Sequence, residues 1–223
     1  MKKRIYRIAA VAVAVLFCVS AWLLYRGEFL SLRSDAQKAE AAEAYVRLAD
    51  LKVFGDKTLG NSRILTFTDA SGQLLGDVQF RRGILGGWQP ISAGYSSGDV
   101  MASSTVGDTG YLVVYAADCP PEIAHYKVQA NPDLEETLMA EGDVTSPSFL
   151  HVYQPEREFF PMLYLYDAQG QELDGREYFK SNGSTGVGSA EVNMVYWVCA
   201  IWLGIGWLLV KYLWDASKKE TVS

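Results

Sequence analysis

Two long apolar stretches without a charged residue enclose the rest of this chain. The first runs from Ile8 to Tyr25 and the second from Val192 to Val210. A helix that crosses a bilayer needs about 20 predominantly apolar residues, and one charge at its centre costs about 2.5 to 3.5 kcal/mol. Both stretches meet this requirement, so the pattern predicts two transmembrane helices. Aromatic residues of the kind found at membrane interfaces lie near their ends: Trp22, Tyr25, Tyr196, Trp197, Tyr212 and Trp214.

Each stretch has an alternative interpretation. Residues 2–7 are basic and Val19-Ser20-Ala21 has the small residues of a cleavage site, as in a secretory signal peptide. Against this alternative, the apolar run continues past that site to Tyr25. The second stretch has the composition of a buried core helix as well, but its length and the basic tail that follows favour a membrane span.

Charged residues predict the orientation of the two spans. Four Lys and Arg residues and no acid precede the first span, whereas three Lys residues and two acids follow the second. The positive-inside tendency therefore predicts that both termini are cytoplasmic. Of the 20 Lys and Arg residues 13 remain between Arg26 and Glu191, and of the 26 acids 24 remain there, a net charge of −11. So acidic a segment argues against a nucleic-acid or anionic-lipid surface, which needs clustered basic residues.

The segment after the first span begins with a helical pattern. Ser34 and Gln37 match a capping box, and apolar residues from Ala41 to Leu51 recur at helical spacing. Gly55 is expected to end this helix. Two arrangements fit the pattern: a helix nearly continuous with the first span, with a break at Gly27, or a separate helix whose apolar face packs on a sheet.

From Arg63 onward the apolar period changes to two, which predicts an antiparallel β domain. The strand Tyr111–Ala117 is apolar on both faces and is expected at the centre, whereas Glu122–Ala130 has one face toward water. The remaining expected strands are Arg63–Thr68, Leu74–Arg82, Ile91–Tyr95, Val100–Val106, Phe149–Gln154, Met162–Asp167 and Gln171–Arg176.

The predicted fold class is a membrane protein with two transmembrane α-helices that flank an extracytoplasmic α+β domain. The β-sheet of this domain is expected to be mainly antiparallel, like a sandwich or barrel. The predicted parts are a cytoplasmic N-terminus (1–7), transmembrane helix 1 (8–25), a juxtamembrane amphipathic helix and linker (26–62), a β-rich domain (63–178), a Gly/Ser linker (179–191), transmembrane helix 2 (192–210) and a cytoplasmic tail (211–223).

One short motif occurs twice. An alternating strand is followed by Asp-Ala-x-Gly-Gln at Asp69–Gln73 and again at Asp167–Gln171. Asp opens a type I turn and Gly takes the left-handed position, so the motif predicts two tight turns. A calcium loop is the functional alternative, but it needs several more oxygen ligands at fixed offsets.

Residues with catalytic potential are few and scattered. Cys119 is the only cysteine outside the two spans, so no disulfide is expected within the β domain. His125 and His151 have strand contexts, and two isolated histidines are weak evidence for a metal site or a general base. The acidic pairs Glu135-Glu136 and Glu156/Glu158 are typical of a solvated acidic surface. We therefore predict no catalytic residue, no metal and no cofactor.

Two anchors around a β domain with one cysteine form a layout similar to that of class C sortases. The Thr-Leu-x-Thr-Cys motif of that family is absent around Cys119. Both histidines follow the cysteine, whereas the sortase histidine precedes it. The resemblance is thus limited to the layout and implies no activity.

The second span carries the strongest signal for an interaction. Ala200 and Gly204 offer small residues on which another helix packs closely, and Trp202 lies near the bilayer midpoint. The lipid bilayer is the expected partner, together with a membrane protein or a second copy that contacts Ala200, Trp202 and Gly204; no nucleic acid is expected. The sequence favours an accessory protein for binding, sensing or assembly at the cell membrane. The alternative is a membrane-anchored hydrolase or thiol enzyme that uses Cys119 or acidic residues.

Overall fold

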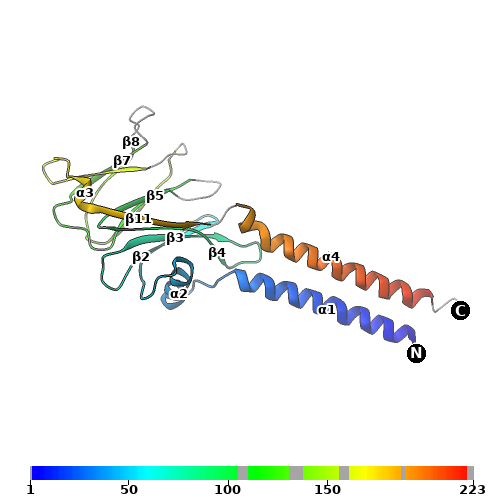
Figure 1. The fold of residues 1–223 in the computed structure, drawn as a ribbon. Helices are drawn as coiled ribbons and strands as arrows, with labels where there is room; N and C mark the ends of the chain where they lie inside the picture. Colours follow the sequence, from blue (N-terminus) through cyan, green and yellow to red (C-terminus); the bar gives the residue numbers. More distant parts are fainter. Residues whose placement is uncertain (1, 105–109, 131–137, 156–160, 187–188, 220–223) are drawn as a thin grey trace. The chain divides into compact units, whose positions relative to one another are not determined.

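The chain forms two compact units in a computed structural model, which describes residues 2–104, 110–130, 138–155, 161–186 and 189–219 (Figure 1). One unit is helical and consists of residues 1–30 and 188–223. The other consists of residues 31–187 and contains the β-sheets. Each unit is described below by itself.

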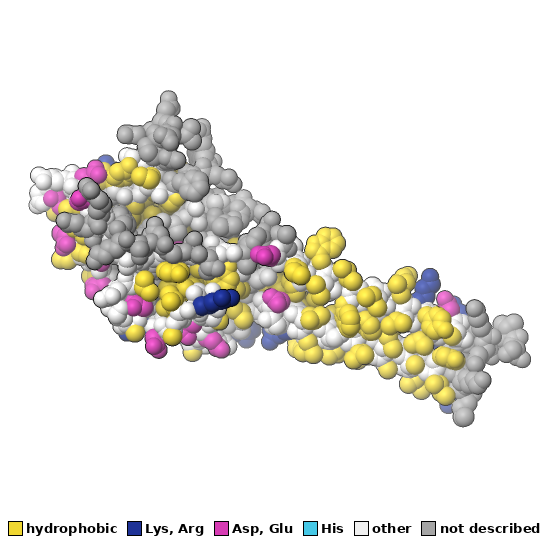
Figure 2. Space-filling model, in the orientation of Figure 1, with side chains coloured by type: hydrophobic (Ala, Val, Ile, Leu, Met, Phe, Trp, Pro, Cys, Tyr) yellow, Lys and Arg dark blue, Asp and Glu magenta, His cyan; other side chains and the backbone are white. Residues whose placement is uncertain are grey.

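The helical unit is an antiparallel pair of long helices, α1 (Lys2–Glu28) and α4 (Ser189–Lys219) (Figure 1). The stretches Arg4–Glu28 and Glu191–Lys218, 25 and 28 residues long, are each long and apolar enough to cross a membrane. Apolar side chains cover much of their visible surface in Figure 2. Two long apolar helices therefore flank the β unit in the sequence, as predicted.

Aromatic side chains join the two helices near the end of α1. Tyr25 and Phe29 stack with ring centroids 4.2 Å apart, and Tyr196 of α4 lies 5.9 Å from Phe29. Val195 and Cys199 complete this cluster. Near the chain termini the guanidinium of Arg7 lies 5.5 Å from the Trp214 ring centroid. Contacts at both ends thus keep the helices in one register.

The β unit contains three antiparallel sheets, which we name A, B and C. Sheet A has the order β1-β2-β3-β4-β11, sheet B β5-β6-β9 and sheet C β10-β7-β8. The strands are β1 (Lys52–Leu59), β2 (Ser62–Thr68), β3 (Leu75–Arg82), β4 (Trp88–Gly98), β5 (Met101–Ser104), β6 (Leu112–Ala116), β7 (His125–Gln129), β8 (Leu138–Asp143), β9 (Phe149–Tyr153), β10 (Met162–Tyr166) and β11 (Phe179–Gly186).

Sheet B lies between the other two sheets. Its strand β6 packs against sheet A on one side and against sheet C on the other. Val113 and Tyr115 pack with Ile64 and Leu75 of sheet A. The alternate residues of β6, Leu112, Val114 and Ala116, pack in a second cluster with residues of sheet C such as Tyr126 and Val128. Every residue of β6 is buried. The prediction that this strand is central because both of its faces are apolar is confirmed.

Helix α2 (Asp35–Val46) begins with the predicted capping box. The Gln37 backbone N–H donates to Ser34 Oγ (3.3 Å), and the Gln37 side chain accepts from the Ser34 backbone. Its end differs from the prediction, because Arg47 adopts a left-handed conformation (φ 62°) and stops the helix eight residues before Gly55. α1 and α2 are separate helices, so the nearly continuous helix is excluded.

Most predicted strands of the β unit are confirmed, but four segments differ. β1 lies where the helix and its linker were expected, and β8 and β11 were not predicted as strands. β11 occupies most of the predicted Gly/Ser linker and pairs with β4, because backbone hydrogen bonds do not require apolar side chains. The expected strand Gln171–Arg176 forms only a bridge at Glu172, followed by the short helix α3 (Gly175–Tyr178). Residues 105–106 of one predicted strand lie outside the described residues.

Both copies of the Asp-Ala-x-Gly-Gln motif form the predicted turns. Gly72 and Gly170 have φ values of 73° and 77°, which favour glycine. The first turn joins β2 to β3, with the Leu74 N–H donating to Asp69 Oδ1 (2.8 Å). In the second turn the N–H of Gln171 donates to Asp167 Oδ1 (2.8 Å). The Asp and the Gly that both copies share are thus explained by the turns that they form.

Candidate functional site

Trp202 lies in the contact between the two long helices. Its Nε1–H donates to Ser20 Oγ of α1 (2.6 Å), and its ring centroid is 4.8 Å from that of Phe17. One turn further along α4, Gly206 packs directly on Phe17: a Cβ built on this glycine would lie 2.5 Å from the ring. Trp202 is 38% exposed, so it contacts α1 and is still partly open to the surroundings.

Ala200 and Gly204 lie on a different face of α4 from Trp202. Both are exposed, and a Cβ built on Gly204 would meet no atom within 4 Å. The three residues predicted to form a partner surface are therefore divided: Trp202 takes part in the α1–α4 contact, whereas Ala200 and Gly204 face outward. These two residues, four positions apart, define what we call the open face of α4.

A groove on the helical pair borders Trp202. Its volume is about 680 Å³, and it is lined mainly by apolar and small residues: Ser20, Leu23, Leu24, Gly27, Glu28 and Trp202. Sequence reasoning missed this groove, because five of its six lining residues belong to α1 and the sixth is 174 or more positions away. The sequence feature that could have indicated the groove is the pair of small residues Ser20 and Gly27, which lie two helical turns apart.

Cys119 is a buried residue whose thiol has a raised pKa. Its side chain belongs to the apolar cluster between sheets B and C and is 5% exposed. Burial first, and then the carboxylates of Asp99, Glu122 and Asp118, raise the pKa of its thiol to about 12. A nucleophilic cysteine needs the thiolate near neutral pH, so this environment suits a structural residue.

The two histidines have separate environments. His125 is exposed, and its Nδ1 lies 2.6 Å from Asp143 Oδ1 on the neighbouring strand. His151 is partly buried, with its Nδ1 2.5 Å from the Tyr126 hydroxyl, and burial lowers its pKa. Among the described residues no group of three or more His, Cys, Asp or Glu side chains is placed to hold a metal ion. Glu135, Glu136, Glu156 and Glu158 lie outside the described residues.

Tyrosine hydroxyls connect the sheets inside the β unit. Tyr115 of sheet B donates to the buried Asp77 Oδ1 of sheet A (2.8 Å), and Gln79 Nε2 donates to Asp77 Oδ2 (3.1 Å). Burial raises the pKa of Asp77 against the opposing effect of these hydrogen bonds. Tyr126 of sheet C contacts His151 and Tyr153 of sheet B, each at 2.5 Å. These buried and partly buried contacts fix how the layers face each other.

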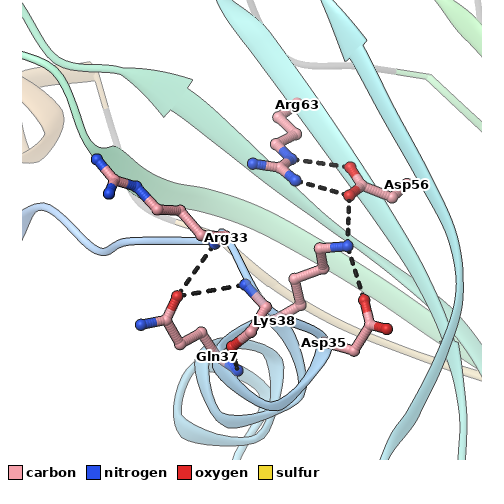
Figure 3. A network of polar contacts seen from close by, with 7 residues as sticks. Arg33, Asp35, Gln37, Lys38, Asp56 and Arg63 are labelled. Carbon is pink, nitrogen blue, oxygen red and sulfur yellow. Dashed lines mark hydrogen bonds and ion pairs between the residues drawn. The ribbon is translucent and has the colours of Figure 1, made fainter.

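An ionic network attaches α2 to sheet A (Figure 3). Arg63 holds Asp56 through two hydrogen bonds of 2.8 and 2.6 Å, and Lys38 Nζ lies 2.9 Å from the same carboxylate. Lys38 also contacts Asp35 at 2.8 Å. Burial of Asp56 favours its neutral form, but the hydrogen bonds from Arg63 and Lys38 outweigh this effect and lower the pKa of Asp56. The network therefore holds α2 against sheet A.

Comparison with known proteins does not assign the chain to a family. No family model and no curated protein matches it. Among solved structures, the variable domain of the AgI/II polypeptide BspA from Streptococcus agalactiae was found at 12% identity, covering 60% of this chain and 89% of that domain. The TM-score of 0.15 is too low for this likeness to carry any conclusion about fold or function.

Proposed function

We propose that this chain is a two-pass membrane protein whose acidic β unit lies on the extracytoplasmic side and serves binding, sensing or assembly through a membrane partner. Two observations support the location. α1 and α4 are long and apolar enough to cross a membrane. The basic residues that precede α1 and follow the apolar part of α4 correspond to the positive-inside tendency.

The proposal of a membrane partner rests on the open face of α4. Helices in a bilayer associate where small residues let their backbones approach closely, often with a small-xxx-small spacing. Ala200 and Gly204 have this spacing, are exposed and take no part in the α1–α4 contact, which uses Gly206 instead. A partner helix can therefore pack on this face without disturbing the pair.

The enzymatic alternative has less support. The pKa of about 12 leaves Cys119 protonated at neutral pH, and its thiol is buried. The buried carboxyl of Asp77 is enclosed between two sheets, where its hydrogen bonds go to Tyr115 and Gln79. We therefore propose a role that depends on contacts between proteins.

Substitution on the open face tests the proposal. In the full chain expressed in its own membrane, Gly204→Leu and Ala200→Leu should abolish co-purification of the partner or crosslinking to a second copy, because the added side chain prevents close approach of a helix. Ile201→Leu is the matched control, since it changes an exposed α4 residue without adding volume. Unchanged co-purification and unchanged self-association in both variants would refute the proposal.

A further inference from the structure

The turn between β3 and β4 is a compact structure that projects two apolar side chains. The Gly86 N–H donates to the Gly83 carbonyl (3.0 Å), and the Gly83 N–H donates to the Gly87 carbonyl (3.1 Å). Gly86 and Gly87 have φ values of 87° and 82°, which only glycine adopts readily. Ile84 and Leu85 occupy the two central positions of this turn, and both side chains are exposed.

Apolar residues at these positions are unusual. Central turn positions normally carry Gly, Pro, Asn, Asp or Ser. Ile84 is 79% exposed and Leu85 is 72% exposed, more than any other large hydrophobic residue described in the β unit, where Leu138 follows at 49%. Arg81 and Arg82, both exposed, directly precede the turn. We call residues 81–87 the β3–β4 tip.

Strand register places this tip at the end of sheet A from which the chain continues to α4. Gly186, the last residue of β11, pairs with Ser92 of β4. The strands are antiparallel, so β11 runs toward the end of β4 at which Trp88 and the tip lie. From Ser92 to Trp88 the strand advances about 13 Å at about 3.3 Å per residue.

The chain length limits how far the membrane helix can start from this end of the sheet. α4 begins at Ser189, three residues after Gly186, and three residues span at most about 11 Å. The start of α4 and the tip are therefore both tied to one end of sheet A. This follows from register and covalent connection within the chain.

We propose that the β3–β4 tip is a membrane-contacting element, in which Ile84 and Leu85 enter the interfacial region of the bilayer that holds α4 and Arg81 and Arg82 bind lipid phosphate groups. Burial of exposed apolar surface drives such contact, and guanidinium groups form paired hydrogen bonds with phosphate. The acidic β unit as a whole disfavours an anionic membrane surface, but this tip is locally basic and apolar. Zwitterionic phospholipid, which also carries phosphate, is thus a sufficient partner.

Depth-dependent quenching tests this contact in the full chain reconstituted into phosphatidylcholine vesicles. An environment-sensitive fluorophore is attached at Leu85→Cys in a chain whose Cys18, Cys119 and Cys199 are replaced by alanine. We expect blue-shifted emission and quenching by lipid that carries a nitroxide near its headgroup. Adding Ile84→Ser to the labelled chain should reduce the quenching at least twofold, because Ile84 is the large apolar side chain that remains at the tip once Leu85 carries the label.

Two labelled positions serve as controls. Ser71→Cys lies in the β2–β3 turn, at the opposite end of β3, and should remain unquenched. Ile201→Cys is an exposed residue of α4 and should be quenched by deep nitroxides if α4 spans the bilayer. Quenching at residue 201 with a water-exposed label at residue 85 would refute the membrane contact alone. Absence of quenching at both positions would refute membrane residence, on which this inference and the proposed function both rest.

Discussion

Gly142 shows how a single residue makes room for the hydroxyl contacts between sheets B and C. It lies opposite Tyr126 in the β7–β8 pair. A Cβ at this position would lie 2.5 Å from the Tyr126 hydroxyl and 2.8 Å from the Tyr153 hydroxyl. The absence of a side chain is therefore a condition for the hydrogen bonds of both tyrosines.

Gly142→Ala should lower the free energy of unfolding of the β unit by about 1–3 kcal/mol, because the methyl group displaces packed hydroxyls. Thermal unfolding of the purified chain in detergent measures this change. Gly110→Ala is a matched control, since a Cβ there meets nothing within 4 Å. Equal melting temperatures for the two variants would contradict this description of the tyrosine contacts.

Asp56 makes the attachment of α2 depend on pH. Its pKa is lower in the folded chain than the ordinary value of 3.8. The contribution of Asp56 to stability is therefore complete above about pH 4 and is lost as the pH falls through the lowered value. The pKa of Lys38 is raised by its hydrogen bonds to Asp35 and Asp56, so its contribution is complete below 10.5 and is lost at higher pH.

We expect Asp56→Asn to lower the free energy of unfolding at neutral pH by about 1 kcal/mol, a small value because solvent partly screens the network. The difference from the unmodified chain should shrink as the pH falls below 4. Asp35→Asn should have a smaller effect, since the Asp35 side chain is 93% exposed. A melting-temperature difference for Asp56→Asn that stays constant from pH 7 to strongly acidic pH would argue against the network.

At the scale of elements, two glycines of α4, Gly204 and Gly206, have different surroundings in the helical pair. Gly206 packs on Phe17, whereas Gly204 has open space beside it. We predict that Gly206→Leu lowers the melting temperature of the chain in detergent, because the leucine separates α1 from α4, and that Gly204→Leu leaves it unchanged. Phe17→Ala should partly restore the Gly206→Leu variant. Equal effects at residues 204 and 206 would contradict the observed register of the helices.

Elements whose signals are local could be predicted from the sequence. The capping box at Ser34 and Gln37 and the turns at Asp69 and Asp167 depend on neighbouring residues, and all are confirmed. β6 was recognisable because both of its faces are apolar. Local chemistry thus accounts for these elements.

Elements whose signals are distant could not be predicted in the same way. β11 is rich in Gly and Ser and becomes a strand through its pairing with β4, more than 80 positions earlier. The helix predicted to end at Gly55 stops at Arg47, because the left-handed conformations of Arg47 and Asp50 turn the chain toward β1. The contact between Trp202 and Ser20 likewise joins residues 182 positions apart, so no local pattern reveals it.

At the scale of the whole molecule, the proposed function depends on the side of the membrane on which each part lies. The proposal requires both long helices to cross the membrane, so that the β unit lies on one side and the two termini lie on the other. A cleavable signal peptide at residues 1–21 would leave only α4 as an anchor and would remove the α1–α4 pair. Topology and retention of α1 are thus the central claim.

Reporter fusions to the full chain test this claim most directly. We predict that alkaline phosphatase inserted after Arg33 is active, that green fluorescent protein after Ser223 fluoresces, and that an N-terminal tag remains attached to the membrane-bound chain. An extracytoplasmic C-terminus, an inactive phosphatase after Arg33 or loss of the N-terminal tag would contradict the two-pass arrangement.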